Sequence, residues 1–251
     1  MGKLERLEVL SAAERQARID LAAAFRLAVR MELHEGVCNH FTLMLPDGKR
    51  FLLNPYGLHW SEVSASNLLA LDADGRILQG EGEAEKTAFC IHSRIHLANS
   101  RAACVLHTHM PYATALTLTE PGRLEMVEQN ALRFADDIAY DDSYNGLVVD
   151  NAEGDRLARV LGAKRVLFLA NHGVLVVGPT VAEAYDLLYY LERACRLQVL
   201  ARATGLPFRK VRPEVVRETY RMILADTPKY AGAHFAALKR ILDREDPGYA
   251  R

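Results

Sequence analysis

An excess of charge of either sign is missing from this 251-residue sequence, in which 31 lysines and arginines stand against 32 aspartates and glutamates. A net charge of −1 gives no positive field to attract a phosphate backbone or an anionic lipid surface, so we expect no nucleic-acid partner and no membrane partner. No apolar run approaches the roughly 18 residues of a membrane-spanning helix. The first residues also lack the apolar segment of a signal peptide. We therefore expect a cytoplasmic protein.

Cysteine is scarce, and several well-known cofactor motifs are absent. The four cysteines are widely spaced and form no Cys-x-x-Cys pair, which favours buried free thiols over disulfides. The sequence contains no G-x-G-x-x-G motif, no phosphate-binding loop and no G-x-S-x-G motif. It therefore carries no sequence sign of a dinucleotide site, a nucleoside triphosphate site or a serine nucleophile of that type.

The hydrophobic patterns that are present predict an α/β chain with a central sheet. Capping patterns at Ser11 and Thr180 mark two helix starts. Strands and helices do not alternate regularly, which favours a mixed or antiparallel-rich sheet over a doubly wound one. No linker or repeat interrupts the chain, so we expect one domain over 1–251, with a core at about 21–204 and a helical tail over 205–251. The expected strands lie at 40–46, 50–55, 68–78 (a hairpin), 104–109, 133–140 and 166–178 (two strands), and the expected helices at 11–36, 84–100, 111–117, 151–162, 180–203 and 213–240.

Two histidines stand at the end of an apolar run in CVLHTHMPYATALT. Because His107 and His109 are two residues apart, both rings leave the same face of a strand and can converge on one metal ion. Zinc takes imidazole nitrogens at about 2.0–2.1 Å, and its catalytic sites often combine three protein ligands with one open position. His172, between two apolar runs in VLFLANHGVLVVG, is the expected third ligand, and Gly173 is expected to relieve the backbone there.

The other histidines show weaker patterns. His92 and His96 are spaced i, i+4 on one helix face, which is a ligand spacing, but burial with hydrogen bonds to neighbours is the simpler interpretation. His40 is a candidate fourth ligand, and a fourth protein ligand would indicate a closed, structural metal site. Spacing gives no role to His34, His59 or His234.

Four stretches together resemble the class II aldolase/adducin family, over about 21–204. They are GVCNHFTLMLPDG, NPYGLHWSEVSASNLLALDADGRILQGEG, FCIHSRIHLANSRAACVLHTHMPYATAL and LANHGVLVVGPTVAEAYDLLYYLERACRLQ. The resemblance implies a three-layer α/β/α fold around a mainly antiparallel sheet, a site near a subunit interface and a cyclic homotetramer. It also implies that His107, His109 and His172 hold a divalent metal that stabilises the ene-diolate formed when a carbon–carbon bond breaks. Zn²⁺ is the first expectation, while Mn²⁺, Fe²⁺, Co²⁺ and Ni²⁺ also suit imidazole ligands.

The sequence departs from the family's sugar-phosphate aldolases at their Ser-Ser-Glu triplet. Counted back from His107, the triplet falls on Lys86, Thr87 and Ala88. The catalytic glutamate position therefore holds an alanine, which has no group to transfer a proton. In this respect the chain looks closer to the adducin-like branch of the family, where the glutamate is absent.

Candidates remain for each role that the resemblance implies. Glu85 is the candidate substitute carboxylate, and Tyr144 is the candidate proton donor because the family's aldolases use a tyrosine in that way. By position, Asn39, Lys86 and Thr87 are candidate substrate-binding residues.

Several functions stay open at this point. The first is a metal-dependent carbon–carbon lyase acting on a small molecule. The second is a metal-dependent decarboxylase of a hydroxy-aromatic or keto acid, which needs no base to remove a hydroxyl proton. A non-catalytic, adducin-like scaffold or binding protein is the third, and a hydrolytic or redox zinc enzyme is a further alternative because it needs only three histidines and an open position.

Overall fold

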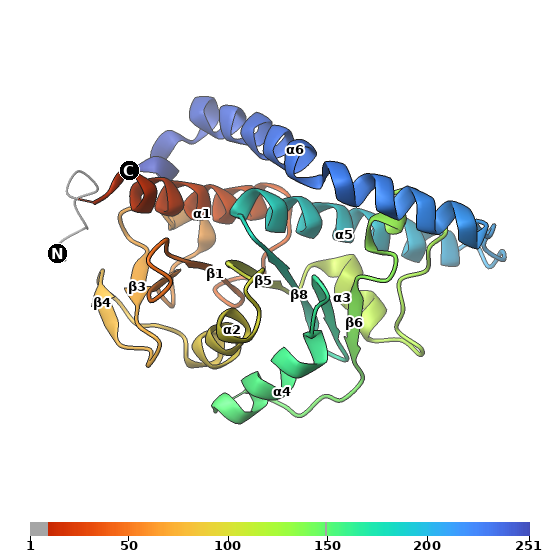
Figure 1. The fold of residues 1–251 in the computed structure, drawn as a ribbon, viewed down its shortest axis with the longest axis horizontal. Helices are drawn as coiled ribbons and strands as arrows, with labels where there is room; N and C mark the ends of the chain where they lie inside the picture. Colours follow the sequence, from red (N-terminus) through yellow and green to blue (C-terminus); the bar gives the residue numbers. More distant parts are fainter. Residues whose placement is uncertain (1–9, 149) are drawn as a thin grey trace.

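A single mixed sheet lies between two layers of helices in the computed structural model, which describes residues 10–148 and 150–251 (Figure 1). Over these residues the sheet has eight strands in the order β4-β3-β2-β1-β5-β8-β7-β6. Neighbouring strands are antiparallel except β6 and β7, which are parallel. The strands are β1 (His40–Met44), β2 (Phe51–Leu53), β3 (Leu69–Leu71), β4 (Ile77–Gln79), β5 (Cys104–Thr108), β6 (Ile138–Asp141), β7 (Val166–Leu169) and β8 (Gly173–Gly178). The mainly antiparallel sheet confirms the predicted fold class.

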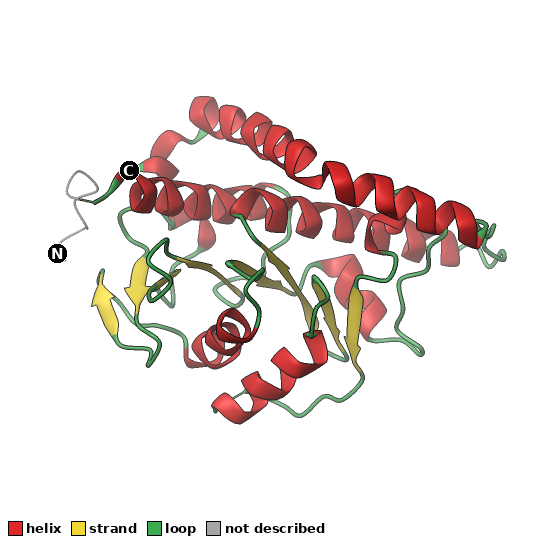
Figure 2. Cartoon of the chain, viewed as in Figure 1, coloured by secondary structure: helices red, strands yellow, loops and turns green. Residues whose placement is uncertain are grey.

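The helices cover both faces of the sheet, which gives the expected α/β/α layers (Figure 2). One layer contains α1 (Ala12–Arg30), α3 (Pro111–Thr117) and α5 (Val181–Arg202), and the other contains α2 (Lys86–Ala98) and α4 (Asn151–Leu161). The last helix, α6 (Pro213–Glu245), lies along α1 and α5 on their side away from the sheet. The 3₁₀ segments within the described residues are η2 (Trp60–Glu62), η3 (Ala131–Phe134) and η4 (Pro247–Ala250).

The alternation of side chains along β5 delivers its histidine to one face of the sheet. Cys104 and Leu106 join the apolar cluster beneath α1 and α5, whereas Val105 joins the cluster beneath α2 and α4. Because successive strand residues point to opposite faces, His107 lies on the same side as Val105. The two-residue alternation of side chains along β5 therefore places His107 on the face covered by α2 and α4.

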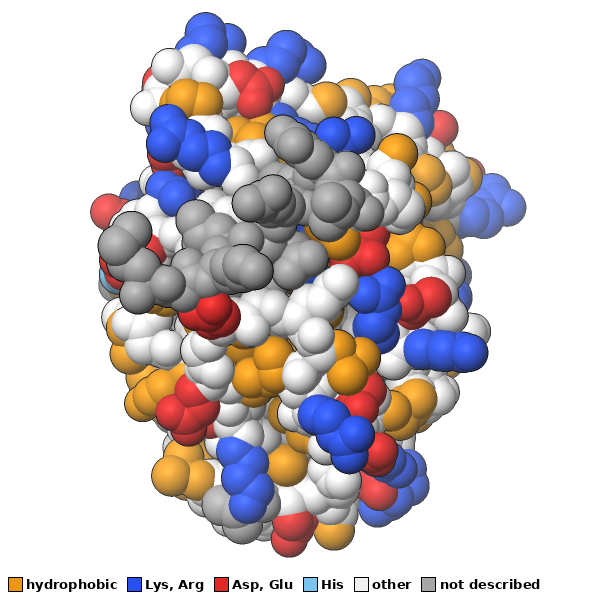
Figure 3. Space-filling model, turned by 90° about the vertical axis from the view of Figure 1, so that its left-hand side faces the viewer, with side chains coloured by type: hydrophobic (Ala, Val, Ile, Leu, Met, Phe, Trp, Pro, Cys, Tyr) orange, Lys and Arg blue, Asp and Glu red, His pale blue; other side chains and the backbone are white. Residues whose placement is uncertain are grey.

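The long C-terminal helix is joined to the main core. Phe235, Leu238 and Leu242 of α6 belong to the same apolar cluster as the buried faces of α1 and α5. No helix within the described residues is long and apolar enough to cross a membrane. On the face shown in Figure 3, basic and acidic side chains are interspersed rather than gathered by sign, in keeping with the balanced composition.

The predicted helix starts are confirmed, but three other expectations need correction. Ser11 and Thr180 cap α1 and α5 by accepting the backbone N–H of the third residue that follows each of them. The first helix ends at Arg30, before Gly36, because the chain takes a positive φ of 56° at Glu32. The strand expected at 133–140 covers only 138–141, since the residues before it form η3.

The third correction concerns the cysteines. Cys38 is exposed because it lies in the turn between α1 and β1, whereas Cys90, Cys104 and Cys195 are buried as expected. All four are free thiols.

A glycine allows α2 and α4 to pack closely against each other. A Cβ atom built on Gly154 of α4 would lie 2.0 Å from the carbonyl oxygen of Cys90 in α2. No side chain fits at that distance unless the helices separate. By contrast, a Cβ atom on Gly232 of α6 would meet no atom within 4 Å.

We therefore expect Gly154→Ala to lower the free energy of unfolding by about 1–3 kcal/mol, since overpacking forces backbone shifts. Gly232→Ala is the matched control and should raise it by roughly 0.5–1 kcal/mol, because alanine loses less backbone entropy than glycine in a helix. Urea denaturation of both variants measures the two effects. Equal midpoints for Gly154→Ala and the wild type would contradict the close packing.

Candidate metal centre

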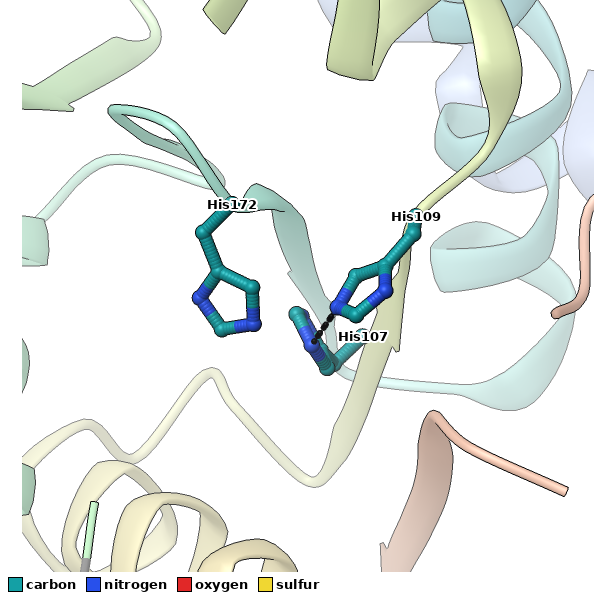
Figure 4. Close-up of side chains that lie close together, drawn as sticks. All are labelled: His107, His109 and His172. Atoms are coloured by element: carbon teal, nitrogen blue, oxygen red, sulfur yellow. Dashed lines mark hydrogen bonds between the residues drawn. The ribbon is translucent and has the colours of Figure 1, made fainter. Parts of the chain in front are cut away.

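Three histidines meet where β5 ends beside the turn between β7 and β8 (Figure 4). His107 is on β5, His109 follows it by two residues, and His172 lies in the β7–β8 turn. Each offers a ring nitrogen, and these nitrogens lie within 4.8 Å of one another. Within the described residues this is the one group of three or more histidine, cysteine or acidic side chains with that geometry. The structure thus brings together the three residues that the sequence pattern selected.

Hydrogen bonds fix the tautomer that two of these rings adopt when they are neutral. His107 Nδ1 lies 3.0 Å from the carbonyl oxygen of Val174, and His109 Nδ1 lies 2.5 Å from the Glu35 carboxylate. Oxygen acceptors of this kind require that each Nδ1 carries the proton. Since a neutral imidazole has only one N–H, both Nε2 atoms present lone pairs.

The two bare nitrogens face each other. His107 Nε2 and His109 Nε2 are 3.2 Å apart, the contact drawn as a dashed line in Figure 4. Two lone pairs at this distance repel unless a cation lies between them. Nitrogens bound to one tetrahedral zinc ion at 2.0–2.1 Å are separated by about 3.3 Å. The donor set therefore fits a divalent metal ion.

Burial keeps His107 and His172 in the form that binds a metal. Burial, followed by the nearby His109, lowers the pKa of His172 to about 4. Burial also holds the pKa of His107 well below its usual range. Removing an imidazolium from water is unfavourable, so both rings stay neutral near pH 7 and their lone pairs remain available.

The Asn171-His172-Gly173 turn holds His172 in place, but Gly173 does not have the role that the sequence predicts. The positive φ of the turn, 57°, is at Asn171 and not at Gly173. Gly173 serves another purpose: a Cβ atom there would lie 2.6 Å from the carbonyl oxygen of Thr108 and 2.8 Å from His109 Cδ2. The missing side chain lets the start of β8 approach the end of β5 and the His109 ring.

Glu35 is a site residue that sequence reasoning missed. It orients His109 through its hydrogen bond, although the two residues are 74 positions apart. Glu35 lies in the irregular segment between α1 and β1, where no periodic pattern indicates a partner. A carboxylate that accepts the outer N–H of a ligand histidine is a common support of metal sites.

Two candidate residues lie beside the three histidines. The Tyr144 ring centroid is 6.4 Å from that of His172, and the side chain is 54% exposed. Asn39 is buried, and its Oδ1 accepts the backbone N–H of His109 at 3.2 Å. Asn39 Nδ2 is buried without a hydrogen-bond partner.

Glu85 lies at the N-terminus of α2. Its carboxylate accepts the backbone N–H groups of Thr87 at 3.1 Å and Ala88 at 2.6 Å, so it caps the helix. Glu85 Oε2 is also 3.8 Å from His40 Nε2. The candidate carboxylate is therefore near a histidine of the sheet, with both oxygens already engaged by backbone amides.

The next three residues have different surroundings. Lys86 is exposed at the first turn of α2. The Thr87 hydroxyl donates to the carbonyl oxygen of Val148 at 3.1 Å. Ala88 is fully buried in an apolar cluster that includes Phe51 and leucines of β2 and β3. The position of the family's glutamate thus faces apolar side chains in this chain.

The remaining histidines near the site are not part of the group of three. His92 and His96 are buried and hydrogen-bonded, as the simpler interpretation predicts. His40 pairs with His107 across β1 and β5, with ring centroids 5.0 Å apart. Its nitrogens lie outside the set within 4.8 Å, so the described residues supply three candidate ligands and not four.

Together these features define an α/β/α protein with an open, three-histidine candidate metal site at the ends of two central strands, β5 and β8, of a mainly antiparallel sheet. The chain belongs to the class II aldolase and adducin N-terminal domain family, whose model matches residues 19–199. An aldolase II superfamily protein from Pseudomonas syringae is 33% identical, with a TM-score of 0.90 over 97% of this chain and 98% of that one.

Two further proteins are similar to this chain, one in sequence and one in fold. The α-adducin of Mus musculus is 35% identical over 199 residues, which cover 76% of this chain but only 27% of that protein. An L-fuculose 1-phosphate aldolase from Glaciozyma antarctica is 23% identical, with a TM-score of 0.84 over 100% of this chain and 97% of that one. That likeness shows a shared fold.

We expect Glu35→Gln to weaken zinc binding by roughly tenfold to a hundredfold, because the amide is a poorer acceptor for the outer N–H of His109. Competition with a coloured zinc chelator measures the affinity. Glu218→Gln, on the exposed surface of α6, is the control and should bind zinc as the wild type does. Unchanged affinity in Glu35→Gln would show that the carboxylate does not support the site.

Gly173→Ala should also weaken zinc binding, by at least about tenfold, because the added methyl group displaces the His109 ring or the Thr108 carbonyl. The same chelator competition, beside a circular dichroism spectrum to establish folding, measures this effect. Wild-type affinity in the folded variant would mean that the close approach of β8 to β5 is unimportant for the site.

Proposed function

We propose that this protein is a divalent-metal-dependent carbon–carbon lyase that acts on a small molecule. The observation that carries the proposal is the pair of bare Nε2 atoms of His107 and His109, 3.2 Å apart, with His172 completing the group. Membership of the class II aldolase family supports a lyase of the aldolase type. Three ligands leave a coordination position open to substrate, as catalytic zinc sites do.

Each residue of the site has a defined task in this proposal. His107, His109 and His172 would hold the ion, with Zn²⁺ as the first expectation and Mn²⁺, Fe²⁺, Co²⁺ and Ni²⁺ as alternatives. When bound, a divalent ion supplies Lewis-acid stabilisation of negative charge that develops on substrate oxygens. Asn39 would donate its free Nδ2 hydrogens to substrate. Tyr144, beside His172 and half exposed, would donate a proton.

Ala88 gives specific support to a second candidate, a metal-dependent decarboxylase of a hydroxy-aromatic or keto acid. Its burial among apolar side chains leaves that position without a general base. Decarboxylation leaves a similar carbanion but removes no hydroxyl proton. The exposed Lys86, at the start of α2, would attract the substrate carboxylate. Glu85 stays a candidate for proton transfer, and Thr87 stays a candidate for substrate binding.

A non-catalytic scaffold, as in the adducin-like interpretation, fits the site less well. Structural zinc sites usually close all four positions with protein ligands, whereas the described residues supply three. We also propose a cytoplasmic homo-oligomer, tetrameric by analogy with the family, and light scattering of the purified protein measures its mass.

The first test is metal content. We expect about one equivalent of metal per chain in protein purified without chelators or a histidine tag, and almost none in a His107→Ala/His109→Ala variant, because imidazole ligands are lost. His234→Gln is the control, since His234 lies on α6 and contacts Asp186. Elemental analysis gives the ratio. A folded wild type that contains no metal and takes up no zinc, manganese or iron would contradict both lyase candidates.

A second measurement separates the two reactions. The metal-loaded protein is incubated with panels of hydroxy-aromatic acids, keto acids and aldol compounds, and both carbon dioxide and aldehyde are measured. Aldehyde release supports the aldolase-type lyase, and carbon dioxide release supports the decarboxylase. Neither product from a metal-loaded protein would favour the scaffold.

A further inference from the structure

A buried chain of hydrogen bonds runs from the backbone next to β5 to the candidate metal centre. The carbonyl oxygen of Ala102 lies 2.6 Å from His96 Nδ1, and His96 Nε2 lies 2.7 Å from the Thr42 hydroxyl. That hydroxyl lies 2.8 Å from His92 Nδ1, and His92 Nε2 lies 2.9 Å from His40 Nδ1. The four side chains are between 0% and 7% exposed, so water does not compete for these bonds.

The Ala102 carbonyl fixes the direction of every bond in the chain. A carbonyl only accepts, so His96 carries its proton on Nδ1 and presents a lone pair at Nε2. The Thr42 hydroxyl must then donate to His96, which leaves its oxygen to accept from His92 Nδ1–H. His92 consequently presents a lone pair at Nε2 and accepts from His40 Nδ1–H.

The last ring of the chain is therefore His40, with its proton on Nδ1 and a lone pair on Nε2. This lone pair faces a second acceptor, Glu85 Oε2, at 3.8 Å. The His40 ring is also 5.0 Å from the ring of His107, one of the candidate ligands. Two acceptors that face each other repel unless a donor joins them, and a hydroxyl group held by the neighbouring metal site would be such a donor.

We propose that His40 is a substrate-binding residue whose Nε2 lone pair accepts a hydrogen bond from a hydroxyl group of a metal-held substrate. The proposal rests on the proposed function of the three-histidine site and adds a requirement on the substrate, which must carry a hydroxyl near the oxygens that the ion holds. Ala102, His96, Thr42 and His92 act as positioning groups, because they keep His40 in the tautomer that accepts.

The tautomer is testable without metal or substrate. In metal-free protein labelled with ¹⁵N-histidine, two-bond ¹H–¹⁵N correlation spectra report which ring nitrogen carries the proton. We expect the proton of His40 on Nδ1 in the wild type and in Thr42→Ser, which keeps the hydroxyl. In Thr42→Val the link is broken, so His92 is free to move its proton to Nε2, and we expect the proton of His40 on Nε2 in at least half of the molecules.

Ligand binding tests the role of the lone pair. Glycolohydroxamate and acetohydroxamate both chelate metal through the hydroxamate group, but only the first carries a hydroxyl. By calorimetry, we expect the zinc-loaded wild type to bind glycolohydroxamate roughly fivefold to tenfold more tightly than acetohydroxamate, the effect of one additional hydrogen bond. The preference should vanish in His40→Asn, which keeps a donor for His92 but lacks the outer acceptor. His40→Gln, whose amide oxygen reaches the position of Nε2, should recover part of it.

The outcomes distinguish this proposal from the one on which it rests. A His40 proton on Nε2 in the wild type, or an unchanged preference in His40→Asn with its zinc content retained, would overturn the role of His40 and leave the metal site standing. Failure of the zinc-loaded wild type to bind either hydroxamate would overturn both proposals, even with the tautomer as expected. Equal loss of zinc in His40→Asn and His40→Gln would assign His40 to the structure of the site and overturn its role as acceptor.

Discussion

The pairing of β5 with β8 is the interaction on which the candidate site depends. Its register places Thr108 opposite Val174 and His107 opposite Leu175. The carbonyl of Val174 is thereby brought to the outer nitrogen of His107. The same pairing puts the turn with His172 next to His109, where Gly173 leaves room for the ring. A shift of one residue would turn the histidine of β5 to the opposite face of the sheet.

Burial of so many imidazoles is tolerated because Nδ1 of five of the rings around the site has a hydrogen-bond partner. A buried polar group without a partner is costly, whereas a fully satisfied network rigidifies its surroundings. Here backbone carbonyls, one carboxylate and one threonine hydroxyl are hydrogen-bonded to the Nδ1 atoms of four of the rings. The Nε2 lone pairs of His40, His107 and His109 remain, at the end of the central strand β5. They lie where a cation and a hydroxyl-bearing molecule would satisfy them.

Much of this arrangement could be predicted from the sequence, because its signals are local. The two-residue spacing of His107 and His109 and the turn around His172 are short patterns with a fixed geometric meaning. Glu35 could not be found in this way, since its role depends on how an irregular segment folds back over β5. The same holds for the Ala102 carbonyl, because every residue has a carbonyl and only the tertiary structure shows which one His96 contacts. The sequence also does not show why Gly173 is a glycine, because a close approach between two strands has no signal in local propensity.

The fixed direction of the buried chain has a consequence for how this protein can change during evolution. A chain of donors and acceptors has polarity, and each link determines the next, so the effects of substitutions at Thr42, His92 and His96 are not independent. Replacing one of these residues reverses or frees the donor–acceptor direction of every hydrogen bond between it and His40. A second substitution that restores the polarity becomes acceptable only after the first has occurred. At these positions a single substitution is therefore unfavourable, whereas joint substitutions are tolerated. Proteins of this fold should differ in the whole hydrogen-bond network rather than in single histidines.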